Sequence, residues 1–251
     1  MICCGHLLKT RTLRLVAILQ KEIAVLKIWD AHNFRRTLTG LSLIAAPLVF
    51  LVSLGALPDL PDDPTAMLAA IAANRERTMV AALLLMLSSV LFLPAFVGLI
   101  HLLRDRGVVL GQLGGGLALL GALGHIGRAT HFLVYVQMTT GGADQAQMVA
   151  LMNRIQGDSA LLPIMLTLGG FDIGLLLLGI GLWRARVRPR WAAAGVVLAI
   201  VLFIIGVVIS GGGTIIVLVV LAGLAISLAA IGWSVLRMSD TDWERLPEQG
   251  G

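Results

Sequence analysis

The sequence has few charged residues, almost no cysteine and a single tyrosine. Only 13% of its 251 residues are charged, whereas about a quarter of the residues of a soluble domain are. With a hydrophobic fraction of 58% and a mean hydropathy of +0.94, this excludes an ordinary water-soluble fold. The two cysteines, Cys3 and Cys4, are adjacent. They therefore provide neither a disulfide framework nor a CxxC or zinc pattern.

Motifs that carry catalytic chemistry are also missing. The sequence contains no Walker A loop, GxSxG elbow, HExxH helix, histidine box or CxxC pair. An enzymatic mechanism needs a nucleophile beside a base or a cluster of metal ligands, and no such motif is present. We therefore expect no enzymatic activity and no cofactor.

Long apolar runs are what the sequence has instead. A run of about 20 apolar residues spans the hydrocarbon core of a bilayer, and a helix satisfies its own backbone hydrogen bonds in lipid. The sequence therefore predicts an all-α, polytopic transmembrane bundle of six helices, with the transmembrane domain at 36–237. The six runs lie at residues 38–57, 78–103, 108–138, 161–183, 191–210 and 214–236.

The basic residues predict the orientation of this bundle. Cytoplasmic loops carry an excess of Lys and Arg, and most of the 19 lysines and arginines fall on one side if both termini are cytoplasmic. The net charge of +5 then reflects topology, and no nucleic-acid partner is expected. We expect a multi-pass protein of the cell inner (plasma) membrane, with anionic lipid headgroups at its basic inner loops. We expect four indoles at the cytoplasmic membrane interface, namely those of Trp29, Trp183, Trp191 and Trp233.

Segments outside the predicted spans have features of their own. Residues 1–35 are basic and carry a modest apolar stripe, which indicates either a helix on the inner leaflet or a poorly ordered extension. Residues 238–251 are acidic and predict a disordered cytoplasmic tail. Each long outer loop predicts a helix, the first capped by Asp63 or Thr65.

Charged residues inside the predicted spans point to a site. On insertion scales such a charge costs roughly 2.5–3.5 kcal/mol, so it usually faces the bundle interior and has a partner. The third span carries Arg128 and the fourth carries Asp172. If these spans end near Thr139 and Leu161, both charges lie about 16 Å from the outer end. The sequence thus predicts that Arg128 and Asp172 are level with each other.

Other polar residues extend this prediction. At 100° per residue, His125, His131 and Tyr135 share a helix face with Arg128. Ser88 and Ser89 of the second span have the same expected depth. We therefore expect a polar layer in the outer half of the bundle. Its candidate residues are His125, Arg128, His131, Tyr135, Asp172, Ser88 and Ser89.

Two functions for this layer follow from the sequence. It either forms a pocket that binds, senses or transports a small solute or protons, or the Arg128–Asp172 pair only specifies packing in a structural or regulatory scaffold. A haem needs two axial histidines on facing helices, and the sequence does not provide them. A metal bound by His125, His131 and Asp172 would be opposed by Arg128, so no metal is expected.

Two stretches resemble a known family. One is GLLLLGIGLWRARVRPRWAAAGVVLAIVLFIIG (174–206), a glycine-rich span that ends in a basic loop with Pro-Arg-Trp before another span. The other is FRRTLTGLSLIAAPLVFL (34–51). Both are similar to the bacterial membrane proteins grouped as DUF4386-like. The resemblance covers residues 34–236, implies a six-helix fold and brings no established activity. Arg128 and His131 match no motif of that family.

Overall fold

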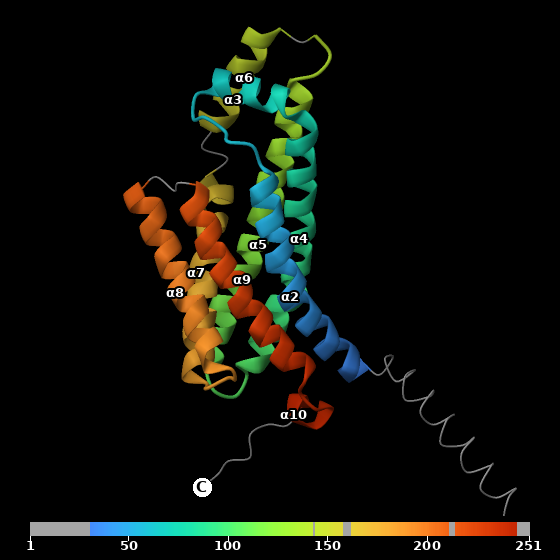
Figure 1. Ribbon diagram of the computed structural model, residues 1–251, viewed down its shortest axis with the longest axis vertical. Helices are drawn as coiled ribbons and strands as arrows, with labels where there is room; N and C mark the ends of the chain where they lie inside the picture. The colour runs from blue at the N-terminus through green and yellow to red at the C-terminus, as the bar shows by residue number, and fades with distance from the viewer. Residues whose placement is uncertain (1–30, 143, 158–161, 211–213, 245–251) are drawn as a thin grey trace, which may run out of the picture.

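The computed structural model describes residues 31–142, 144–157, 162–210 and 214–244 (Figure 1). Every regular element within these ranges is a helix, which confirms the predicted all-α class. The expected interfacial helix in residues 1–35 falls almost wholly outside the described residues. The helices are α2 (Ala31–Ala56), α3 (Pro64–Ala73), α4 (Arg75–Leu102), α5 (Val108–Met138), α6 (Gln145–Gly157), α7 (Leu162–Arg184), α8 (Arg190–Ser210), α9 (Thr214–Leu236) and α10 (Asp240–Glu244).

Five of the described helices are long and apolar enough to cross a membrane, namely α2, α4, α5, α7 and α9. Helix α8 is also apolar, but its described apolar stretch, Arg190–Gly206, is shorter. These helices coincide with the predicted spans to within about one turn, except that α2 begins at Ala31, well before residue 38. The chain therefore has the helices of an integral membrane protein.

The long helices pack in a closed ring. Following the contacts, α2 meets α4, α4 meets α5, α5 meets α7, α7 meets α8, and α8 meets α9, which returns to α2. Their inward faces bury large apolar side chains, while their outward faces leave large apolar side chains exposed. A wide exposed apolar surface is typical of a face that a bilayer covers. Examples of exposed residues are Val97, Leu113, Leu166, Leu198 and Val219.

Glycines set the distance between α5 and α7. A Cβ atom at Gly121 would overlap the backbone of Phe171, and one at Gly174 would overlap the backbone of Ala118. Small residues at such positions let membrane helices approach closely. These close contacts fix the position of α7 along the length of α5.

The two short helices α3 and α6 lie at the end of the bundle opposite α10 (Figure 1). We call these the α3–α6 end and the α10 end. The Asp63 carboxylate accepts a 2.8 Å hydrogen bond from the Ala66 N–H, so the predicted cap of α3 is confirmed. Ile71 of α3 and Met152 of α6 are fully buried. The two helices thus contribute an apolar layer of their own.

The C-terminal segment differs from the expected disordered tail. Residues Asp240–Glu244 form α10, and the Trp243 side chain is buried. The Trp243 backbone carbonyl accepts a 3.0 Å hydrogen bond from Arg104. The centroid of the Trp243 ring lies 4.6 Å from that of the His101 ring. One large indole therefore anchors an otherwise acidic segment to α4.

Candidate functional site

The relative heights of α5 and α7 decide which charges can meet. Gly121 of α5 packs against the backbone of Phe171. Asp172 is the next residue of α7 toward the α10 end, so it is level with about residue 120 of α5. Arg128 lies about eight residues farther toward the α3–α6 end, which is about 12 Å at 1.5 Å per residue. The prediction that Arg128 and Asp172 are level does not hold in the structure.

The cause is the difference in length between these two helices. Helix α5 has 31 residues and α7 has 23. Their ends near α10 are level, since Gly107 lies beside Gly181. The additional residues of α5 therefore all project at the α3–α6 end, where α4 and α5 rise beyond α7 (Figure 1). Within the described residues, Arg128 and Asp172 accordingly form no ion pair at 4.0 Å or less.

A small pocket between α2, α4 and α5 contains two of the predicted residues. Its volume is about 80 Å³, and we call it the arginine pocket. His125 and Arg128 of α5 and Ser53 of α2 form its polar wall. The rest of the wall is apolar and comprises Phe50, Leu54, Leu57, Ala81, Leu85 and Phe132.

Arg128 is the charged group of this pocket. Its side chain is exposed, and its guanidinium lies 5.4 Å from the centre of the Phe132 ring, within cation–π range. No described carboxylate lies within 4.0 Å of it. A guanidinium presents five donors in a planar fork that matches a carboxylate or phosphate. The arrangement therefore suits an anion.

His125 is held by aromatic rings. Its ring meets Phe171 edge-on at 4.7 Å between centroids and meets Phe50 edge-on at 5.3 Å. Its Nδ1 atom is buried and has no hydrogen-bond partner among the described residues. A buried polar atom without a partner carries a desolvation penalty of about 1–3 kcal/mol, which a ligand that bonds to it would remove.

The other predicted residues on α5 lie apart from this pocket. The His131 ring stacks on the Tyr135 ring, with 6.4 Å between centroids and an interplanar angle of 18°. Tyr135 is buried and His131 is half-buried. Neither belongs to the pocket wall. The predicted polar face of α5 is therefore divided between two environments.

Ser88 and Ser89 also lie outside the pocket, because backbone carbonyls occupy both hydroxyls. The Ser88 hydroxyl donates a 2.9 Å hydrogen bond to the Ala46 carbonyl of α2. The Ser89 hydroxyl donates a 2.7 Å hydrogen bond to Leu85 of its own helix. Both serines are fully buried. The first bond joins two helices, and the second remains within α4.

Asp172 lies alone in the middle of α7. It is half-buried, and α7 begins ten residues before it, at Leu162. Among the described residues it has no hydrogen bond or ion pair. The described residues also include no group of three or more His, Cys, Asp or Glu side chains placed to hold a metal ion. Asp172 is thus a separate feature from the arginine pocket.

Sequence reasoning missed the α2 wall of the pocket. The Ser53 hydroxyl donates a 2.8 Å hydrogen bond to the Ala81 carbonyl, and Phe50 packs on His125. A serine within an apolar span is a usable signal, because such hydroxyls often bond to a neighbouring helix. Which helices neighbour α5 cannot be read from the sequence.

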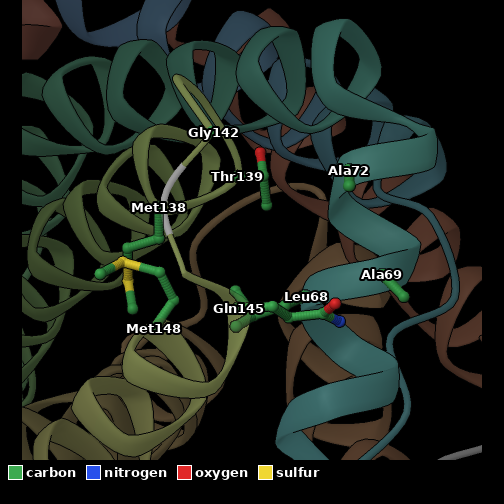
Figure 2. A pocket seen from close by; sticks show the side chains of 8 residues that line it. All are labelled: Leu68, Ala69, Ala72, Met138, Thr139, Gly142, Gln145 and Met148. Atoms are coloured by element: carbon green, nitrogen blue, oxygen red, sulfur yellow. The ribbon is translucent and has the colours of Figure 1, made fainter.

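A larger hollow lies at the α3–α6 end, between α3, the end of α5 and the start of α6 (Figure 2). Its volume is about 410 Å³, and its wall contains apolar and neutral polar side chains. None of the lining residues is charged, so the hollow offers less chemical selectivity than the arginine pocket. The residues are Leu68, Ala69, Ala72, Met138, Thr139, Gly142, Gln145 and Met148.

None of the protein-family models, curated proteins and solved structures compared with the chain matches it. The resemblance to the DUF4386-like proteins therefore stays a prediction. The geometry of the arginine pocket is the remaining basis for a function.

Proposed function

We propose that the protein is an integral membrane protein whose arginine pocket binds a short-chain carboxylate. The observation that carries this proposal is Arg128, a cation on the pocket wall with no described carboxylate within 4.0 Å. A carboxylate can accept two parallel N–H bonds from a guanidinium. Phe50, Leu54 and Leu85 then receive the alkyl end of the solute.

The volume of the pocket limits the size of this solute. On this measure a water-sized group needs about 10–15 Å³, so about 80 Å³ holds roughly five to eight heavy atoms. Longer acyl chains would have to displace Leu54 or Leu57. The unpartnered Nδ1 of His125 provides a second polar atom near the bound carboxylate.

The proposal includes a topology of six spans with both termini in the cytoplasm, in the inner membrane of a bacterial cell. Two features support it. Basic residues gather at the α10 end, as in cytoplasmic loops. Trp183, Trp191 and Trp233 are exposed near that end, as interfacial indoles are. Helix α8 is then the sixth span, and the arginine pocket lies in the outer half of the bundle. This count agrees with the DUF4386-like fold.

Binding of propionate to the purified protein tests the proposed site. Calorimetry of wild type should show binding at one site, and Arg128→Gln should weaken it at least tenfold, because the charge-assisted bonds are lost. Arg154→Gln, which removes an exposed arginine of α6, should bind like wild type. Equal affinities in the wild type and Arg128→Gln would overturn the proposal.

A scaffold role is the second candidate, and the packing of His125 favours it. Its ring lies between Phe50 and Phe171, which belong to two other helices. If no small carboxylate binds and His125→Ala lowers the melting temperature, the polar residues serve packing. If propionate binds, uptake into proteoliposomes separates transport from sensing, since only a transporter accumulates the solute.

A further inference from the structure

A second charged cavity lies at the α10 end, between α2, α4 and α10. Its volume is about 530 Å³. Arg35 of α2 and His101 of α4 line it, together with Arg104 just beyond the end of α4. It shares no lining residue with the arginine pocket. Whatever binds there occupies a different site from the proposed carboxylate, although its place on the cytoplasmic side rests on the topology proposed above.

Helix α10 contacts Arg104 and His101 at this cavity. Arg104 donates a 3.0 Å hydrogen bond to the Trp243 carbonyl, and His101 Nε2 lies 3.2 Å from the same oxygen. The guanidinium of Arg104 also contacts the His101 ring. Because Trp243 is buried against the bundle, these groups are held in place rather than free in solvent. One arginine of the cavity, Arg104, is thus held in place by α10, and the second, Arg35, is exposed beside it.

The other part of the wall is apolar and faces outward. Leu38 of α2 and Val97 of α4 line the cavity and are 37% and 57% exposed. They lie on helices long and apolar enough to cross a membrane, so their exposed faces suit contact with lipid. The cavity therefore has cations at one side and a lipid-facing apolar surface at the other.

We propose that this cavity binds one anionic phospholipid. Its phosphate lies between Arg35 and Arg104, and an acyl chain runs along Leu38 and Val97. Basic pockets between membrane helices on the cytoplasmic side are known to take such headgroups. Glu244 is also on the wall. Asp105, whose carboxylate lies 3.5 Å from Arg104 Nε, and Glu244 both repel the headgroup, so they limit the affinity.

Native mass spectrometry of the full chain with added phosphatidylglycerol tests this proposal. Wild type should retain one phosphatidylglycerol more strongly than phosphatidylcholine. Arg35→Gln should weaken phosphatidylglycerol binding roughly fivefold, the effect of one basic residue near an anionic headgroup. Arg190→Gln removes an exposed arginine at the same end, outside this cavity, and should leave binding unchanged.

Two further measurements separate the possible outcomes. Glu244→Gln should tighten phosphatidylglycerol binding, because it removes a repelling carboxylate without removing a cation. Inorganic phosphate at millimolar concentration should not displace the lipid, since it lacks an acyl chain. The proposed lipid site would be overturned if Arg35→Gln and Arg190→Gln retained phosphatidylglycerol equally well. Full displacement of the lipid by inorganic phosphate would overturn it too.

Discussion

At the scale of single residues, Arg128 and Asp172 have separate surroundings. Arg128 lies on the part of α5 that approaches the α3–α6 end, where its guanidinium stacks on Phe132. Asp172 lies deeper, level with the close approach at Gly121. Each charge therefore has its own surroundings and its own desolvation cost within the apolar bundle. The two residues should act independently on stability.

A double-mutant cycle tests this independence. We expect the effects of Arg128→Gln and Asp172→Asn on the free energy of unfolding in mixed micelles to add to within about 0.5 kcal/mol, as for distant sites. The matched cycle of Arg128→Gln with Phe132→Leu should show a coupling of roughly 0.5–1 kcal/mol, because that pair is in cation–π contact. A larger coupling between Arg128 and Asp172 than between Arg128 and Phe132 would contradict this register of α5 against α7.

Part of the candidate site can be read from the sequence. His125 and Arg128 stand out because polar groups are rare in apolar spans, and the structure places both on one pocket wall. The partner predicted for Arg128 is wrong because the height of one helix against another depends on tertiary packing. Equal distances from the ends of two spans mean equal depth only if the spans end at the same height.

At the scale of helices, the apolar runs predict the elements well. The bounds of α5 and α9 coincide with the predicted spans, since the length of an apolar run directly limits a membrane helix. The sequence does not predict α10, because the order of this helix comes from one indole docking on His101 and Arg104. Such a contact leaves no periodic pattern in the sequence.

Close packing between α5 and α7 gives a prediction at this scale. Gly174→Val should lower the free energy of unfolding by about 1–3 kcal/mol, the usual effect of overpacking, because the new side chain would overlap Ala118 and Gly114. Gly116→Val is the control. It lies on α5, where an added Cβ meets no atom within 4 Å. Equal destabilisation by both variants would show that helix propensity, and not interhelical distance, sets the effect.

At the scale of the whole molecule, the two ends of the bundle differ in charge and in structure. The α10 end carries the arginines of the loops after α4 and α7, and the α3–α6 end carries two short helices and few basic residues. Moving clustered basic loops across a membrane is unfavourable, so this asymmetry supports the proposed orientation with the α10 end in the cytoplasm. In the proposed topology, the arginine pocket and the cavity between α2, α4 and α10 lie toward opposite faces of the membrane.

Labelling of single cysteines in intact cells tests this orientation and the sixth span together. In a background with Cys3→Ser and Cys4→Ser, a maleimide that cannot cross the membrane should label Arg154→Cys and Thr214→Cys, and should label Arg188→Cys only after the cells are opened. Arg188 precedes α8 and Thr214 begins α9. Opposite accessibility at these two positions therefore requires α8 to cross the bilayer. Equal labelling at both positions in intact cells would mean that α8 lies on one side, and the bundle would then have five spans.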